Sequence, residues 1–231
     1  AEYLYWDAER LIPVPNSLDP AKAIPLVLNY IVAYQIMHHS AQVKSGDTVL
    51  IIGASGGIGT ALLQLGKLAG LKMYGIASRN KHSTLMEYRA IPIDYRTQDF
   101  VKVIRQAEPQ GLDAVFDGMA GDYFGRSYSL LRRGGKLVGY GNPQSTAGML
   151  KFLGQIILFN LLPDGRSARA YSTGLSRLDW RPFLGQNGPA LEVRVTLRSV
   201  VLAGLWLGWA GTFIQSDPAR NLSSRLVLMA L

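Results

Sequence analysis

The order of hydrophobic and polar residues between positions 48 and 140 predicts alternating strands and helices. Residues 48–54 read TVLIIGA, a continuous apolar run that is typical of a strand covered on both faces. Further on, the predicted strands are residues 72–77, 91–94, 114–117 and 136–140, and the predicted helices are residues 58–69, 83–89, 98–106 and 123–132. Such alternation with short connections indicates an α/β fold of the Rossmann type, a doubly wound parallel sheet.

The pattern is different on both sides of this unit. Three prolines interrupt the apolar pieces of residues 1–20, and a helix is predicted over residues 20–41. Residues 149–162 (MLKFLGQIILFNLL) predict a strongly apolar helix, and core, dimer face and membrane surface remain open for it, with the first two favoured. After about residue 174 the alternation is lost.

The amino-acid composition excludes several kinds of functional site. The chain has no cysteine and three histidines, so disulfides, thiolate zinc sites and a cysteine nucleophile are excluded within it, and no metal site is expected. The net charge is +8, but the basic residues form no dense run, and we expect no nucleic-acid partner. The first residues do not read as a signal peptide, and the apolar run 199–214 is shorter than the ~20 residues of a membrane span. We therefore expect a cytoplasmic protein without membrane association.

A glycine-rich turn follows the first predicted strand and opens a helix. Gly53, Gly56 and Gly59 have the spacing of a dinucleotide-binding turn. The first glycine allows the tight turn, the second lets the backbone approach a pyrophosphate, and the third lets helix and strand pack closely. The helix then directs free N–H groups at the phosphates. The sequence thus predicts a nucleotide site here.

The end of the second predicted strand indicates which dinucleotide binds. An NAD site usually has an acidic residue about 20 residues after the turn, to hold the ribose hydroxyls. Here the segment IASRNKH holds no acid, but it holds Ser78, Arg79 and Lys81. A hydroxyl and two cations suit a 2′-phosphate through charge-assisted hydrogen bonds, so we expect NADP(H) as the cofactor.

These motifs together resemble one family. The runs AEYLYWDAERLIPVPNSLD, AYQIMHHSAQVKSGDTVLIIGASGGIGTALLQLGKLAG, IDYRTQDF and VFDGMAGDYFGRSYSLLRRGGKLVGYG resemble the zinc-independent quinone oxidoreductase branch of the medium-chain dehydrogenase/reductases, over about residues 1–180. The resemblance implies a GroES-like catalytic domain joined to a Rossmann domain. It also implies hydride transfer from NADPH to a quinone or an activated enone, usually in a homodimer.

The resemblance also implies roles for individual residues. Those at the pyrophosphate are Ser55, Gly56, Gly57, Ile58 and Gly59, and those at the 2′-phosphate are Ser78 and Lys81 with Arg79 as a helper. Tyr95 resembles a tyrosine near the adenosine phosphate, with a core-edge aromatic as the alternative. Gly118 and Met119 would line the adenosine side, and Gly141 and Asn142 would lie beside the nicotinamide, although an asparagine there is also an ordinary turn residue. No catalytic residue is assigned.

The sequence departs from the family's pattern in three places. It starts inside the GroES-like half, it has Val32 where the family usually has a threonine, and it becomes unrecognisable after about residue 184. We therefore divide it into residues 1–30 (catalytic-domain remnant and linker), 31–174 (NADP-binding Rossmann domain) and 175–231 (divergent segment). In the last of these we expect weak local order after residue 185, with a helix at 200–209 as the exception.

The sequence also bears on two other functions. A short-chain dehydrogenase needs a Tyr-x-x-x-Lys pair, and no tyrosine in this sequence is followed four places later by lysine. A Rossmann unit without its substrate domain could instead be a catalytically impaired NADPH-binding or dimerisation module, because hydride transfer needs a closed cleft. This second alternative remains open.

Overall fold

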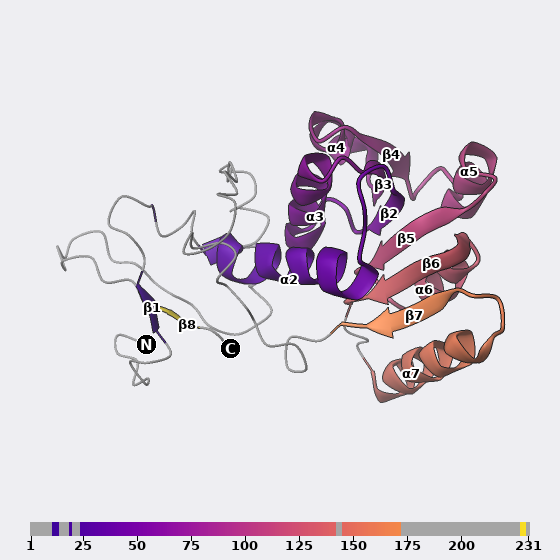
Figure 1. Cartoon of the computed structure of the whole chain (residues 1–231). Coiled ribbons are helices and arrows are strands. Elements are labelled where there is room, and N and C mark those ends of the chain that lie inside the picture. The colour runs from indigo at the N-terminus through magenta and orange to yellow at the C-terminus, as the bar shows by residue number, and fades with distance from the viewer. Residues whose placement is uncertain (1–10, 14–18, 20–23, 142–144, 172–226, 230–231) are drawn as a thin grey trace.

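A six-stranded, fully parallel sheet forms the centre of the structure, a computed structural model (Figure 1). The structure describes residues 11–13, 19, 24–141, 145–171 and 227–229. The strands lie in the order β4-β3-β2-β5-β6-β7. Their bounds are β2 Thr48–Ile52, β3 Lys72–Ala77, β4 Ala90–Asp94, β5 Leu112–Asp117, β6 Leu131–Gly139 and β7 Ser167–Ala170. This is the Rossmann strand order, so the predicted fold class is confirmed.

The strand order reverses between β2 and β5. From β2 the chain moves outward through β3 to β4, then returns to pair β5 with the other side of β2. The loops that leave β2 and β5 therefore diverge to opposite faces of the sheet. In such folds a ligand binds in the crevice at the carboxyl ends of the strands at this point.

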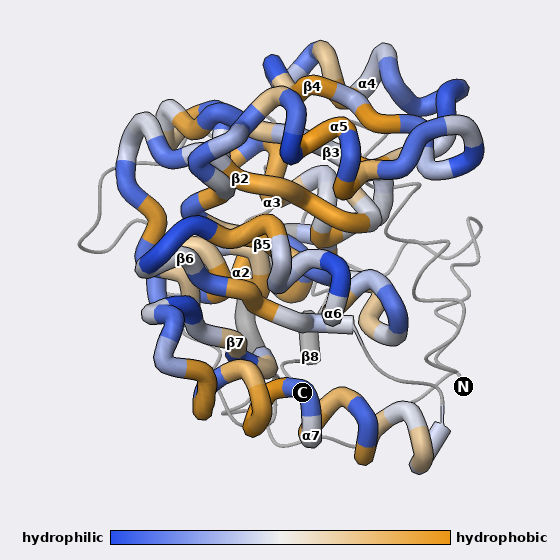
Figure 2. The backbone as a smooth tube through the Cα atoms, turned by 90° about the vertical axis from the view of Figure 1, so that its right-hand side faces the viewer, coloured by the Kyte–Doolittle hydropathy of each residue, from blue (hydrophilic) through white to orange (hydrophobic). Residues whose placement is uncertain are grey.

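Helices cover both faces of the sheet (Figures 1 and 2). One face carries a continuous helix from residue 24 to 41, followed by α3 and α4; the other carries α5, α6 and α7. The first helix changes between π and α hydrogen-bond spacing along its length, as η2 Leu26–Tyr30, α2 Ile31–Tyr34 and η3 Gln35–Ala41. The others are α3 Gly57–Leu68, α4 His82–Glu87 after the short turn η4 Arg79–Lys81, α5 Phe100–Ala107, α6 Asp122–Tyr128 and α7 Thr146–Leu161.

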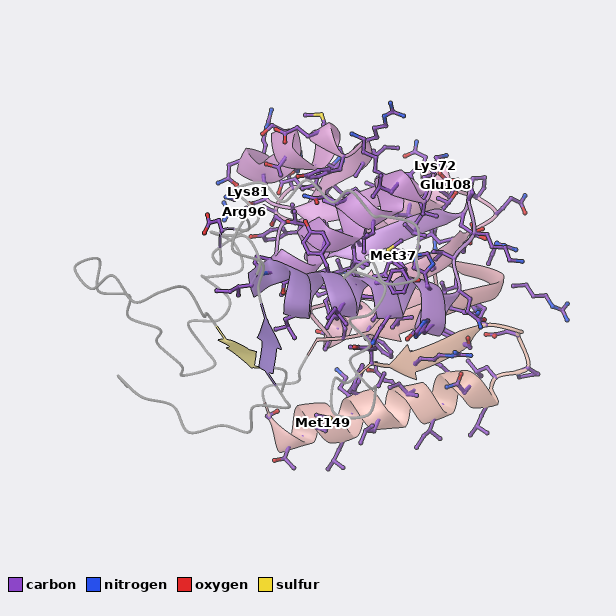
Figure 3. All side chains as sticks on the ribbon, turned by 60° about the vertical axis from the view of Figure 1, so that its left-hand side comes forward. Met37, Lys72, Lys81, Arg96, Glu108 and Met149 are labelled. Atoms are coloured by element: carbon purple, nitrogen blue, oxygen red, sulfur yellow. The ribbon has the colours of Figure 1, made fainter. Side chains whose placement is uncertain are left out.

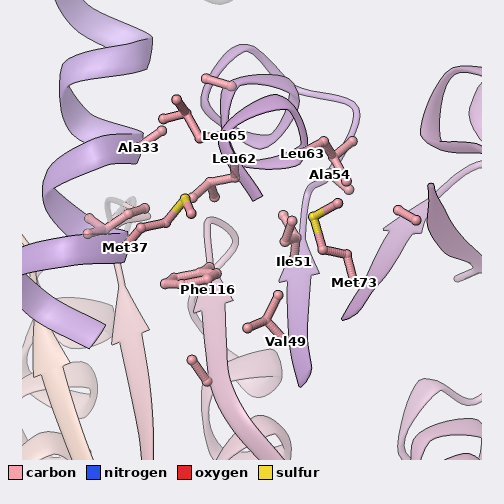
Figure 4. Close-up of a cluster of buried hydrophobic side chains, with 14 of the residues drawn as sticks. Ala33, Met37, Val49, Ile51, Ala54, Leu62, Leu63, Leu65, Met73 and Phe116 are labelled. Atoms are coloured by element: carbon pink, nitrogen blue, oxygen red, sulfur yellow. The ribbon is translucent and has the colours of Figure 1, made fainter. Parts of the chain in front are cut away.

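Alternation along the strands divides the core in two. Val49 and Ile51 of β2 pack with Met37, Leu62 and Phe116 beneath the first helix and α3 (Figure 4). Their neighbours in β2, Leu50 and Ile52, face the opposite side and pack towards α5, α6 and α7. Because both faces are covered, β2 has no polar alternation, as its sequence predicts.

The predicted boundary between α6 and β6 is wrong. A helix was predicted to residue 132 and a strand only from residue 136, but α6 ends at Tyr128 and β6 begins at Leu131. Leu131 pairs with Leu112 of β5, and Gly134, at φ +82°, lets the strand bend before it continues. Tertiary pairing therefore overrides the local helical pattern. β7 was not predicted at all, since of its four residues only Ala168 is buried.

Helix α7 is an apolar surface helix. It begins three residues earlier than predicted, where the Ser145 hydroxyl accepts a hydrogen bond from the Gly148 N–H at 3.0 Å. Only Phe152 is buried, whereas Ile157 and Leu161 are 62% and 75% exposed. One interpretation that the sequence left open was a helix buried in the core. Among the described residues this interpretation is wrong, because most of α7 is exposed.

A second, two-stranded sheet pairs β1 Leu11–Pro13 with β8 Val227–Met229 in antiparallel register. No strand was predicted at either of these positions. The predictions for residues 175–226 lie outside the described residues. Among the helices that the structure describes, none is long and apolar enough to cross a membrane.

Candidate functional site

The glycine turn lies at the switch point, between the end of β2 and the start of α3. Gly53 has φ +77°, a conformation that side-chain-bearing residues rarely adopt, and the Gly56 N–H closes the turn on the Gly53 carbonyl at 3.0 Å. A Cβ on Gly59 would lie 2.2 Å from the Gly53 oxygen and 2.7 Å from Ala54 Cα. The roles predicted for the first and third glycines, tight turn and close packing, therefore agree with the geometry.

The start of α3 can receive an anion. Gly56 occupies the N-cap with no side-chain cap, and the first N–H groups of a helix have no acceptor within it. Together with the helix dipole, such groups bind phosphates. Asn29 was not predicted to lie here: this buried side chain of the first helix lies against the turn, with its Nδ2 2.6 Å from the Cβ position of Gly57. Any side chain at position 57 would displace it.

The predicted 2′-phosphate residues lie in a tight turn after β3. The Lys81 N–H donates to the Ser78 carbonyl at 2.8 Å, and the Ser78 hydroxyl donates to Asn80 Oδ1 at 2.6 Å. Arg79 is exposed and Lys81 is half-buried. Strand register pairs Ala77 with Asp94, so Ser78 and Tyr95 each directly follow the paired ends of adjacent strands. The structure thus brings Tyr95 and the predicted 2′-phosphate residues to the same end of the sheet.

The loop after β5 forms the other side of the crevice. Asp117 is fully buried, and its Oδ1 accepts hydrogen bonds from the N–H groups of Met119 at 2.8 Å and Ala120 at 3.0 Å. Its Oδ2 has no hydrogen-bond partner among the described residues, and burial raises the pKa of the carboxyl. Met119 is exposed, and its Sδ lies 4.0 Å from the Cβ position of Gly53. Met119 therefore borders the glycine turn.

Two loops approach each other closely beside this carboxylate. A Cβ on Gly118 would lie 2.8 Å from the Tyr140 ring, and a Cβ on Gly141 would lie 2.5 Å from the Gly118 oxygen. The Tyr140 hydroxyl donates to the Ile52 carbonyl at 3.4 Å, and burial raises the pKa of this phenol. Asn142, predicted beside the nicotinamide, lies outside the described residues.

The comparisons with known proteins identify the family of the chain. The sequence model of the zinc-binding dehydrogenase family matches residues 57–186. The chain belongs to this family. It is a quinone oxidoreductase-like member of the medium-chain dehydrogenase/reductases, which confirms the resemblance stated from its motifs.

Three similar proteins illustrate the extent of the likeness. It is 37% identical over 145 residues to the synaptic vesicle membrane protein VAT-1 homolog of Danio rerio, covering 62% of this chain and 30% of that protein. It is 25% identical over 214 residues to quinone oxidoreductase of Homo sapiens, covering 87% and 65%. The crystal structure of 2-haloacrylate reductase has a TM-score of 0.60 at 26% identity, covering 71% and 51%. The chain spans only about a third of the length of the VAT-1 relatives it matches.

The residues present do not fit the metal in the family's description. Zinc in proteins is held by cysteine, histidine and carboxylate groups, usually three or four together. The sequence has no cysteine, and in the described segments no three His, Asp or Glu side chains are grouped as ligands. No step of the chemistry is therefore assigned to zinc.

Proposed function

We propose that the chain binds NADPH and acts in a reductase that transfers a hydride to a quinone or an activated enone. The observation that carries this proposal is a pair of features at the ends of the neighbouring strands β2 and β3: the glycine turn that opens α3, and the acid-free turn of Ser78, Arg79 and Lys81. The names of the relatives, quinone oxidoreductase and 2-haloacrylate reductase, support the substrate class.

In this proposal the chain's residues bind and orient the cofactor. Residues 55–59 hold the pyrophosphate with backbone N–H groups, and the turn after β3 holds the 2′-phosphate. Gly118 and Met119 line the adenosine side, and Gly141 lies towards the nicotinamide. When bound, NADPH supplies the hydride, so the protein's contribution is position and exclusion of water.

The alternative function is an NADPH-binding module that turns nothing over. The chain spans only about a third of the length of its VAT-1 relatives, and this short span supports the alternative. Steady NADPH consumption with a quinone such as 1,4-benzoquinone, at a rate proportional to protein, supports the reductase. Tight NADPH binding with no consumption above the protein-free rate supports the module.

Lys81→Ala tests the cofactor directly. We expect the variant to bind NADPH about 5- to 150-fold more weakly, because one charge-assisted hydrogen bond is worth roughly 1–3 kcal/mol, and to bind NADH unchanged. Isothermal titration calorimetry with both nucleotides gives the two dissociation constants. Lys102→Ala, which removes an exposed lysine on α5, is the matched control. Equal weakening for NADPH and NADH contradicts the assignment.

We further propose that the chain associates with a second copy through α7. Leu150, Leu153, Ile157 and Leu161 form an exposed apolar stripe along this helix, and such patches are rare on soluble monomers. Figure 2 shows α7 along the outer edge of the fold. We expect Ile157→Glu to lower the solution mass towards one chain, measured by light scattering after size exclusion. Leu68→Glu, at a similarly exposed leucine on α3, should leave the mass unchanged; an unaltered mass in both contradicts the proposal.

A further inference from the structure

The turn after β4 is held in one shape by its own hydrogen bonds. Asp94 is buried, and its carboxylate Oδ1 accepts from the Arg96 N–H at 3.0 Å. The Asp94 carbonyl accepts from the N–H groups of Thr97 at 3.2 Å and Gln98 at 2.9 Å. The Gln98 side chain in turn accepts from the Asp94 N–H at 2.9 Å. The backbone that carries Tyr95 and Arg96 is thus fixed before any ligand binds.

Within this turn Arg96 lies over Tyr95. The guanidinium carbon lies 5.6 Å from the centre of the ring. The pKa of Arg96 is raised, mainly by its interaction with the Tyr95 side chain. Tyr95 is 47% exposed and belongs to neither core cluster. Its ring is therefore available as a platform, since aromatic faces attract guanidinium groups within about 6 Å.

This platform is next to the turn that carries the predicted phosphate residues. β3 and β4 are neighbouring parallel strands, with Ala77 opposite Asp94. Figure 3 shows Lys81 and Arg96 at the same end of the sheet. In the part of the chain that the structure describes, no carboxylate forms an ion pair with Arg79, Lys81 or Arg96. Three cations thus gather at one end of the sheet, and the nearby Asp94 carboxylate accepts the Arg96 backbone N–H without forming an ion pair with any of them.

We propose that Arg96, held on the ring of Tyr95, is a contact for the 2′-phosphate of NADPH and helps to select NADPH over NADH. The inference rests on the proposed function. A guanidinium offers a planar pair of donors that matches two phosphate oxygens, which the ammonium of Lys81 does not. Tyr95 then acts as a positioning residue, through the guanidinium that it orients.

The test is cofactor binding by the full chain. We expect Arg96→Gln to weaken NADPH about 5- to 30-fold and NADH less than 2-fold, a range that corresponds to one partly exposed charge-assisted contact. Arg89→Gln is the matched control, since Arg89 is equally exposed but directly precedes the other end of β4. It should change neither constant by more than 2-fold. Equal losses for NADPH and NADH in Arg96→Gln, or no loss, overturn the inference.

A double-mutant cycle tests the platform. Tyr95→Leu should weaken NADPH in the wild-type background but by less than 2-fold when Arg96→Gln is already present, because the ring acts through the arginine. Additive losses overturn the platform role. If wild type binds neither nucleotide, the proposed function and this inference both fail. If wild type prefers NADPH and Lys81→Ala removes the preference while Arg96→Gln does not, only the inference fails.

Discussion

Gly59→Ala lowers the free energy of unfolding by about 3 kcal/mol, the upper part of the range for overpacking a well-packed interior. The added Cβ would lie 2.2 Å from the Gly53 oxygen and 2.7 Å from Ala54 Cα. Both are backbone atoms of the turn, so no side chain can rotate away, and α3 must move away from β2. Urea unfolding followed by far-ultraviolet circular dichroism measures the loss.

Two other glycines provide the controls for this prediction. Gly154 on α7 has no atom within 4 Å of its Cβ position, so Gly154→Ala should stabilise the chain by roughly 0.5–1 kcal/mol. A Cβ on Gly56 would lie 3.3 Å from the Gly53 oxygen, a contact that a small shift relieves. Gly56→Ala should therefore keep the fold while weakening NADPH. If Gly59→Ala unfolds at the same urea concentration as wild type, the helix and strand are not packed as closely as described.

The part of the fold that the sequence predicts best is the first βαβ unit. β3 has the predicted bounds, β2 begins as predicted but ends two residues earlier, and α3 begins and ends one residue earlier. A strand buried on both faces must be continuously apolar, and a turn with φ near +77° strongly favours glycine. Where one physical requirement leaves so few residue types, the residue type reveals the structure.

Prediction failed where tertiary pairing decides. The segment after Tyr128 has helical residues, yet it forms a strand because Leu131 pairs with Leu112. β7 is too short and too exposed to carry a hydrophobic signature. The apolar character of α7 left core, dimer face and membrane surface open, because burial depends on what packs against a helix, which composition does not state.

The candidate site, like the fold, has one part that the sequence predicts and one part that it does not. The glycine turn and the cations after β3 each lie in one contiguous segment, so the sequence alone could predict them. Asn29, Arg96 and Asp117 reach the site from separate elements, and only the sheet register and the loop geometry bring them there. For Asp117 a signal existed, since a carboxyl that ends a buried strand needs hydrogen-bond donors.

Asp117 should make the stability of the chain depend on pH. Its carboxyl has no exposure, and burial raises its pKa above the ordinary value of 3.8 despite two backbone hydrogen bonds. The folded state therefore binds a proton that the unfolded state has released in the window between 3.8 and the raised pKa. Stability that the neutral carboxyl provides is present below this window and is lost as pH rises through it. Asp117→Asn, which cannot ionise, should lack this loss.

The expected result is a difference between variants that grows with pH. The free energy of unfolding of Asp117→Asn, minus that of wild type, should rise from acidic to neutral pH and then become constant, as measured by urea titration at several pH values. Parallel pH profiles for the two proteins would show that the pKa of Asp117 is not raised in the folded state.

Asp117→Leu separates the hydrogen bonds from the charge. Asparagine keeps an oxygen for the N–H groups of Met119 and Ala120, whereas leucine leaves both donors without it. Each donor left unpaired costs about 1–3 kcal/mol, so the leucine variant, with two such donors, should be about 2–6 kcal/mol less stable than the asparagine variant at every pH. Ala120 has φ +56°, a strained conformation that these bonds maintain. Their loss should release the loop that carries Met119 and weaken NADPH binding. If the leucine variant matches the asparagine variant in stability and in affinity, Asp117 does not hold the wall of the crevice.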